Sequence, residues 1–218
     1  MSLKGKTIIL CLPGNTYSGK FMTSLLELVF HINRQGGQAI VSQQYSSMVN
    51  FARCKVAGAD VTRGPDQEPF GGQPYDYMMW IDSDIVFSNQ EFDQLVKMDC
   101  DVASGWYQQP GGSTPVVEKM DSEYFQENGT YEFISGQEMS ERKFEFKADY
   151  IGFGWVLIKQ GVFEKMKYPW FAPKRMKVGE YYDMCSEDVA WCLDAKEADI
   201  DIYVNPRAHV GHEKIQII

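Results

Sequence analysis

The chain has 218 residues, of which 44% are hydrophobic, and carries a formal net charge of −9 with a pI near 4.9. This size suits one globular domain, and the acidic balance disfavours a nucleic-acid backbone or an anionic membrane as a partner. The five cysteines are scattered without metal-binding spacing, which is typical of reduced thiols. Because neither a signal sequence nor an apolar run of roughly 18 residues is found, we expect a cytoplasmic protein with no integral membrane segment.

The first half of the sequence alternates apolar strand-like runs with segments of helical periodicity. In chain order these are a strand at 7–12, a helix at 19–34, a strand at 38–43, a helix at 46–59, a strand at 75–81, a short helix from 88 and a strand at 101–107. Ser46 or Ser47 is expected to cap the second helix. A capping box, Ser88 to Glu91, is expected to begin the third.

The second half begins with a polar, glycine-containing region, 108–147, in which the alternation of KFEFKA predicts antiparallel strands. The remaining elements are a strand at 150–159, a short helix near 161–166, a flexible segment at 167–185, a helix at 186–198 capped by Ser186 and a strand at 201–204. Strand–helix alternation predicts an α/β fold with a mostly parallel sheet flanked by helices, and the 108–147 region is interpreted as a small antiparallel or irregular insertion.

The triplet Asp82-Ser83-Asp84 follows a buried apolar run, at the edge where open α/β sheets bind ligands. Two carboxylates there suit Mg²⁺ or Mn²⁺ bridging to a diphosphate. The alternative is an ordinary turn at the end of a strand. Two further triplets of this kind, at 99–101 and 199–201, precede strands, where acidic turn residues are common.

The stretch GNTYSGKF, residues 14–21, matches the phosphate-binding pattern G-x-x-x-x-G-K between a predicted strand and a predicted helix. Phe21 stands where a serine or threonine hydroxyl would hold Mg²⁺, and Tyr17 lies where the backbone would wrap a phosphate. A P-loop-like NTPase that uses Lys20 is therefore the alternative function.

Glu187 and Asp188 begin a predicted helix, where acidic residues are favoured by the helix dipole, so their functional interpretation needs a substrate nearby. His209 and His212 lie in the segment RAHVGHEK, and at least one of them is a candidate metal ligand. Gly211 argues against a helix that would present both rings to one site.

Taken in order, YDYMMWIDSDIVF, DVASGWY, YIGFGWVLIKQGVFEKMKYPWF and SEDVAWCLDAKEADIDIYVNPRAHVGHEK resemble the family 2-like glycosyltransferases of the GT-A fold. The resemblance covers residues 7 to about 214. It implies a GT-A, Rossmann-like domain over 1–218, with a nucleotide-binding half at about 1–107 and an acceptor-binding half at about 108–218.

The resemblance implies that Asp84 coordinates Mn²⁺ or Mg²⁺ and that Asp82 contacts the ribose or the metal shell. His212 resembles the late histidine of the metal site, with His209 as the second choice. Asp188 would deprotonate the acceptor hydroxyl of an inverting enzyme.

In the same resemblance Glu187 would orient Asp188 or the acceptor. The substrate-binding positions that it implies are Pro13, Asn15 and Arg53 around the nucleotide and Gly154 with Trp155 along the sugar pocket. Trp106 would form part of the wall on the acceptor side. The partners implied are a nucleotide-sugar donor and a glycan, lipid-linked or protein acceptor. A retaining outcome, a hydrolase and a non-catalytic nucleotide-sugar-binding protein remain alternatives.

Overall fold

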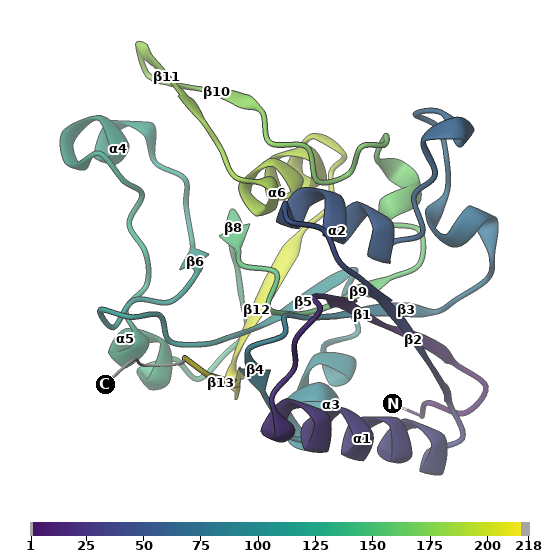
Figure 1. Cartoon of the computed structure of the whole chain (residues 1–218). Helices are drawn as coiled ribbons and strands as arrows, with labels where there is room; N and C mark the ends of the chain where they lie inside the picture. Colours follow the sequence, from purple (N-terminus) through teal and green to yellow (C-terminus); the bar gives the residue numbers. More distant parts are fainter. Residues whose placement is uncertain (1, 215–218) are drawn as a thin grey trace.

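The computed structural model describes residues 2–214, which form a domain with a seven-stranded sheet at its centre (Figure 1). The strands stand in the order β2-β1-β3-β9-β5-β12-β7. Their bounds are β1 Thr7–Pro13, β2 Gln38–Gln44, β3 Tyr77–Ile81, β5 Val102–Trp106, β7 Phe146–Lys147, β9 Trp155–Lys159 and β12 Ile202–His209. The domain predicted from the sequence extends to both chain ends, and its residues 1 and 215–218 lie outside the described part.

Five of the seven strands run in one direction, because β9 is antiparallel to β3 and β5 and β7 is antiparallel to β12. The central strands β3 and β5 are buried along their whole length, as their continuous apolar runs predicted. The predicted α/β fold with a mostly parallel sheet is confirmed. Since β3 ends at Ile81, Asp82 and Asp84 lie just beyond its carboxyl end.

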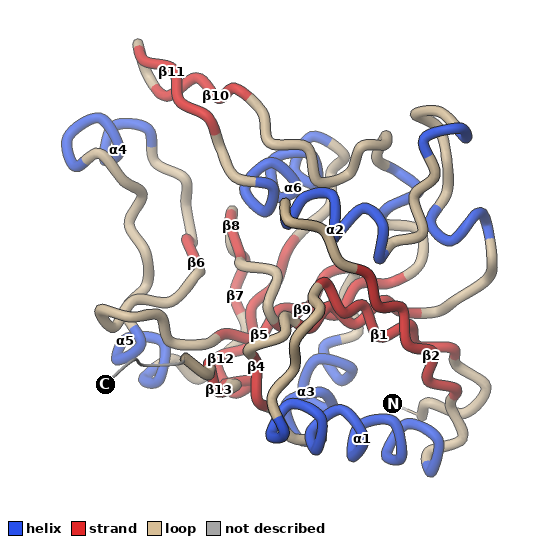
Figure 2. The backbone as a smooth tube through the Cα atoms, viewed as in Figure 1, coloured by secondary structure: helices blue, strands red, loops and turns tan. Residues whose placement is uncertain are grey.

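Helices cover both faces of the sheet (Figure 2). The longer helices are α1 Gly19–Arg34, α2 Val49–Val56, α3 Asn89–Met98 and α6 Glu187–Glu197. α1 and α3 lie on one face and share a core cluster with Leu10, Ile81 and Leu157. α2 and α6 lie on the other and pack with Trp80 and Val204.

The starts predicted for α1 and α3 are both confirmed. Ser18 caps α1 by accepting from the Phe21 amide, and Ser88 with Glu91 forms the predicted capping box of α3. The cap predicted for α2 is wrong, because the helix begins after Met48 with no side-chain cap. The Ser46 hydroxyl instead accepts from the Met48 amide, 3.4 Å away, in the turn before the helix.

The strand predicted at 150–159 is divided into β8 Tyr150–Ile151 and β9 by a turn at Gly152–Gly154. The turn is needed because β8 pairs with β6 Val116–Val117, whereas β9 enters the main sheet. The short helix predicted near 161–166 is a single 3₁₀ turn, η3 Phe163–Lys165. Two further 3₁₀ turns lie in the loop between α2 and β3, η1 Val61–Arg63 and η2 Pro69–Gly72.

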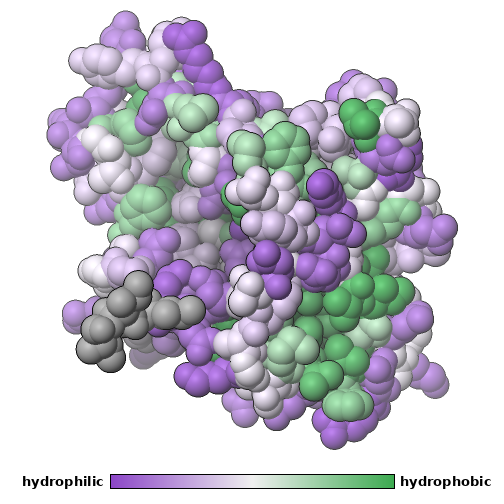
Figure 3. Space-filling model, in the orientation of Figure 1, coloured by the Kyte–Doolittle hydropathy of each residue, from purple (hydrophilic) through white to green (hydrophobic). Residues whose placement is uncertain are grey.

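The 108–147 region contains the predicted short antiparallel strands, β6 and β7, of which β7 joins the main sheet, and it also contains two helices that were not predicted, α4 Ser122–Asn128 and α5 Gly136–Glu141. The segment predicted to be flexible contains a hairpin, β10 Arg175–Val178 and β11 Tyr181–Met184. Its turn residue Gly179 rests against Gln126 of α4. Figure 3 shows the molecular face hollowed between the α4 lobe and the body of the sheet. No described helix is long and apolar enough to cross a membrane.

Candidate functional site

The turn after β3 is fixed by a bond within itself and by contacts with two other segments. The Asp82 amide donates to the Gly154 carbonyl at 3.1 Å, and the Ile85 amide donates to the Asp82 carbonyl at 3.1 Å. A Cβ on Gly14 would lie only 3.0 Å from the Ser83 Cβ. The loop after β1, the turn after β3 and the turn before β9 therefore meet at one edge of the sheet.

Arg53 of α2 is a buried cation, 4% exposed, that joins two carboxylates. Its Nη1 lies 3.0 Å from Oδ1 of Asp82, its Nη2 lies 3.1 Å from Oδ2, and its Nε lies 3.2 Å from Oε1 of Glu187. Burial alone would lower the pKa of the Arg53 guanidinium, but Asp82 and Glu187 reverse that effect and raise it. Arg53 thus holds both carboxylate oxygens of Asp82, Oδ2 through a hydrogen bond from Nη2 and Oδ1 through an ion-pair contact with Nη1.

Asp84 faces His212, which a short antiparallel pair brings to it. The strands are β4 Ile85–Val86 and β13 Gly211–His212, with the Glu213 amide donating to the Asp84 carbonyl at 2.7 Å. Nε2 of His212 lies 3.2 Å from Oδ2 of Asp84, and Nδ1 lies 3.0 Å from the Gln108 carbonyl oxygen. The Lys214 ammonium donates to the same Oδ2 at 2.6 Å.

The hydrogen bond to Gln108 decides which nitrogen of His212 is free. A carbonyl oxygen only accepts, so Nδ1 carries a proton. In the neutral ring Nε2 then presents a lone pair to the carboxylate, and two acceptors at 3.2 Å repel each other unless a proton or a cation lies between them. A backbone carbonyl that fixes the ring in this way is typical of metal-binding histidines.

Among residues 2–214 no group of three or more His, Cys, Asp or Glu side chains is arranged to hold a metal ion. The two carboxylate oxygens of Asp82 are occupied by Arg53. The available donors are one oxygen ligand, Asp84, and one nitrogen ligand, His212. Such a set fits Mg²⁺ or Mn²⁺, which complete their coordination with water and substrate phosphates, but it does not form a closed protein cage.

The acidic pair at the start of α6 is divided between two environments. Glu187 is 8% exposed and turned to Arg53. Asp188 is half-buried and accepts hydrogen bonds from the Tyr150 hydroxyl at 2.9 Å and from the Ser186 hydroxyl. Burial and the neighbouring Asp188 raise the pKa of the Tyr150 phenol, so it stays protonated and donates. Only Asp188 of the pair is oriented by two hydroxyls.

The tryptophans expected near a sugar pocket lie in the core. Trp106 is 2% exposed and Trp155 is 0% exposed, so neither ring face is open to a ligand. His209, the second candidate metal ligand, stacks on Trp106 with ring centroids 3.9 Å apart. Burial lowers the pKa of the His209 imidazole.

Gly154, predicted to line the sugar pocket, is required by a close approach. A Cβ there would lie 2.5 Å from Cε1 of Tyr107. The ring of Tyr107 in turn meets that of His212, with centroids 4.8 Å apart. The glycine therefore lets the turn before β9 pack directly against the side chain that supports His212.

The 14–21 loop is closed by side chains of the loop itself and of β2. The Tyr17 hydroxyl donates to the carbonyls of Leu12 and Gly14, at 3.3 and 3.0 Å, and the Gln43 amide also donates to Gly14. Lys20 points outward, its side chain 75% exposed, and lies 3.5 Å from Glu213. Pro13 is half-buried at the end of β1, and Asn15 is exposed at the rim of the same loop.

No family model and no curated protein matches the sequence. Solved structures do. A197 from STIV superposes with a TM-score of 0.54 at 15% identity, over 98% of this chain and 96% of that one. GalNAc-T7, solved with UDP, GalNAc and Mn²⁺, superposes with a TM-score of 0.50 at 11% identity.

The second match covers 97% of this chain but only 44% of GalNAc-T7. The chain has a GT-A-like fold. At these identities the likeness extends to the arrangement of the backbone and not to any residue of the site.

Several residues around the candidate site carry no signal in the sequence. Lys214, the Gln108 carbonyl and Tyr150 each contact a predicted site residue, and the contact pairs are 130, 104 and 38 residues apart. Ser186 was predicted as a helix cap, but its hydroxyl donates to Asp188 and makes no capping bond to the backbone.

Proposed function

We propose that the chain is a metal-dependent glycosyltransferase that moves a sugar from a nucleotide-sugar donor to an acceptor hydroxyl. The observation that carries this proposal is the position of Asp84 Oδ2 only 3.2 Å from Nε2 of His212, just beyond the carboxyl end of β3. Support comes from the GT-A-like fold, which is shared with a protein solved with UDP, GalNAc and Mn²⁺. Open α/β sheets bind their ligands at this edge.

Asp84 and His212 would hold Mn²⁺ or Mg²⁺, and Lys214, which donates to Asp84, would balance the charge of that carboxylate when no metal is bound. The metal would supply positive charge beside the leaving diphosphate. Asp82 is held by Arg53, so in this proposal it contacts the ribose and acts on the metal only through the outer shell. His209 is not assigned to the metal, because its ring is stacked on Trp106.

Asp188 is proposed to take the proton of the acceptor hydroxyl, with inversion at the sugar carbon. The Tyr150 and Ser186 hydroxyls fix its carboxylate, and a base placed in this way typically contributes about 10²–10⁴-fold to the rate. Glu187 reaches Arg53 and would orient the start of α6 without contacting substrate.

The proposal also assigns the two halves of the chain to different substrates. Residues 1–107 would bind the nucleotide, with Pro13 and Asn15 at the base and Arg53 behind the ribose contact. Residues 108–218 would bind the acceptor. Because Trp106 and Trp155 are buried, they would support the pocket from behind, and Gly154 would shape it by letting the turn before β9 pack against Tyr107.

The test is a thermal-shift panel of UDP-, GDP-, CMP- and dTDP-sugars and ATP, each with and without Mn²⁺. A ligand at about 100 times its Kd stabilises a protein by about 2.7 kcal/mol, enough to raise the Tm measurably. We expect a metal-dependent shift with one nucleotide sugar, lost in Asp84→Ala. Asp201→Ala, in a similar acidic triplet on the surface, should keep the shift.

Other outcomes would replace the proposal. A shift with ATP alone that is abolished by Lys20→Ala would identify the 14–21 loop as the nucleotide site. A shift with a nucleotide sugar, without release of the nucleotide in the presence or absence of acceptors, would indicate a binding protein.

A further inference from the structure

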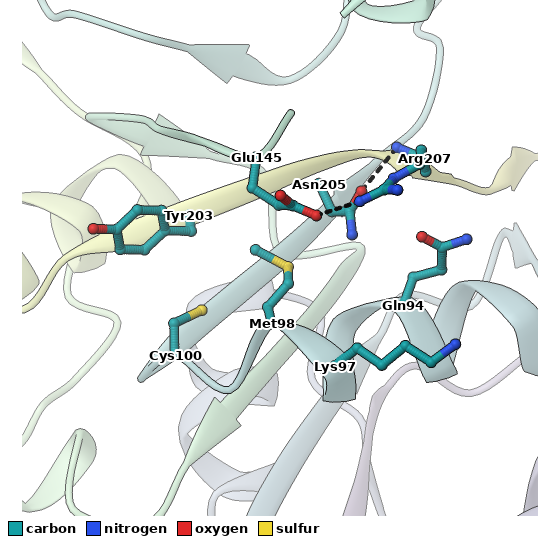
Figure 4. Close-up of a pocket in the computed structure, with 8 residues that line it drawn as sticks. All are labelled: Gln94, Lys97, Met98, Cys100, Glu145, Tyr203, Asn205 and Arg207. Atoms are coloured by element: carbon teal, nitrogen blue, oxygen red, sulfur yellow. Dashed lines mark hydrogen bonds and ion pairs between the residues drawn. The ribbon is translucent and has the colours of Figure 1, made fainter. Parts of the chain in front are cut away.

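A cavity of about 680 Å³ lies between α3 and β12, and none of its lining residues belongs to the candidate site (Figure 4). Its walls are formed by α3, by Cys100 just after that helix, by β12 and by Glu145 next to β7. The β12 side chains Tyr203, Asn205 and Arg207 line it from the side of the sheet.

Asn205 of β12 is the buried polar residue of this cavity, 2% exposed. Its Oδ1 accepts from the Arg207 amide at 3.0 Å, which fixes the orientation of the side chain. Its Nδ2 donates to no residue within 2–214 and points into the cavity (Figure 4). Because the rest of the Asn205 side chain is buried and fixed, this Nδ2 group is presented to the cavity in one orientation and is available to a ligand.

The other polar groups of the cavity are mainly donors. Arg207 is paired with Glu145 at 2.6 Å, which leaves part of its guanidinium free. Lys97 has no ion-pair partner among the described residues, and the amide of Gln94 faces the same space (Figure 4). Two cations and two amides thus surround a space that contains a single, already paired carboxylate.

We propose that this cavity is a second ligand site that binds a small organic phosphate. The Asn205 Nδ2 group binds one phosphate oxygen, and Lys97 and Arg207 balance the charge. The volume exceeds that of a bare phosphate, so the organic part lies along the side chains of Met98 and Tyr203. This site is independent of the proposed transferase function and of Asp84.

Cys100 lines the cavity and provides a selective reporter. It is partly exposed, whereas Cys11, Cys54, Cys185 and Cys192 are buried. Burial raises the pKa of the Cys100 thiol to about 11, so it reacts slowly and takes no covalent part in binding. Alkylation of the native protein should nevertheless occur first at this residue.

The experiment follows the rate of Cys100 alkylation by iodoacetamide in the folded protein, read by mass spectrometry. Inorganic phosphate and ribose 5-phosphate are the probes, and ribose is the uncharged control. We expect ribose 5-phosphate to slow alkylation several-fold and saturably, inorganic phosphate to do so more weakly, and ribose to have no effect. Asp84→Ala should leave this protection unchanged, which separates the site from the proposed donor site.

The matched variant is Asn205→Asp, which keeps the oxygen that binds the Arg207 amide but replaces the donor with an anionic oxygen. Asn205→Asp should abolish the protection of Cys100. If this variant does not fold, Lys97→Gln is the substitute, and it should weaken the protection. Lys119→Gln, at an exposed lysine outside the cavity, should behave as wild type. An unchanged alkylation rate up to about 10 mM ribose 5-phosphate, or equal protection in Asn205→Asp, would overturn the proposal.

Discussion

Arg53 shows how one side chain can hold a site together. It is buried, and its guanidinium is shared by Asp82, at the end of β3, and Glu187, at the start of α6. Removing one member of a buried charge group leaves the others uncompensated, which is far more costly than losing a surface pair. We therefore assign Arg53 first to the stability of the site and only second to substrate contact.

Arg53→Met should lower the free energy of unfolding by about 3–5 kcal/mol, because it leaves the buried carboxylate of Glu187 and the half-buried carboxylate of Asp82 without a cation. Urea unfolding followed by circular dichroism measures this change. The control is Lys147→Gln, which removes a surface pair with Asp201 and should cost less than about 1 kcal/mol. Equal effects of the two substitutions would show that Arg53 is not the cation that balances these carboxylates.

Asp84, Asp188 and His212 could be named from the sequence because each follows or begins a recognisable element. The residues that contact them could not be named from the sequence. Lys214 and Tyr150 reach them only after strands distant in sequence are paired, and no local pattern around either residue differs from an ordinary surface lysine or core tyrosine. The metal expectation rested on carboxylate spacing, which could not reveal that Arg53 occupies Asp82.

The same distinction holds for whole elements. The bounds of α1 and the capping box of α3 follow from residues within one turn of the helix start, and both predictions are confirmed. The cap of α2 and the continuity of 150–159 were mispredicted because tertiary pairing decides them. In particular, the sequence cannot show that Tyr150–Ile151 pairs with β6 while Trp155–Lys159 pairs with β3 and β5.

The turn between β8 and β9 gives a test at this scale. Gly154→Ala should destabilise the protein by about 1–3 kcal/mol, because the added methyl group would lie 2.5 Å from the Tyr107 ring. Chemical denaturation measures the loss, and Tyr107→Leu in the same chain should recover part of it. Gly19→Ala, at a helical glycine with no atom within 4 Å of the added group, should be neutral or slightly stabilising. A neutral Gly154→Ala would contradict the close packing of this turn.

At the scale of the whole molecule, the two ends of the sheet differ. One end is β7, only two residues long, and the other is β2, seven residues long and without a charged side chain. Ile40 and Val41 of β2 are 42% and 48% exposed. Figure 3 shows apolar side chains gathered at the lower right, over β2 and α1. A long, uncharged, exposed edge strand favours edge-to-edge aggregation.

Val41→Lys should therefore raise the concentration at which the protein begins to aggregate, with little change in Tm. Light scattering during concentration measures the onset. The matched control is Val61→Lys, which adds the same charge at a 79% exposed position outside the sheet and should change the onset much less. An equal improvement from both variants would attribute the effect to net charge rather than to the edge.

The Arg53 contact also has a kinetic consequence. Arg53 and Glu187 are 134 residues apart, and Asp84 and His212 are 128 apart, so both pairs close very long loops. Loops of this length cost entropy before their contacts repay it, and proteins dominated by such contacts fold slowly. We therefore expect the contacts of Arg53 and Asp84, at the carboxyl end of β3, to form late in folding, after the strands that carry these residues have paired.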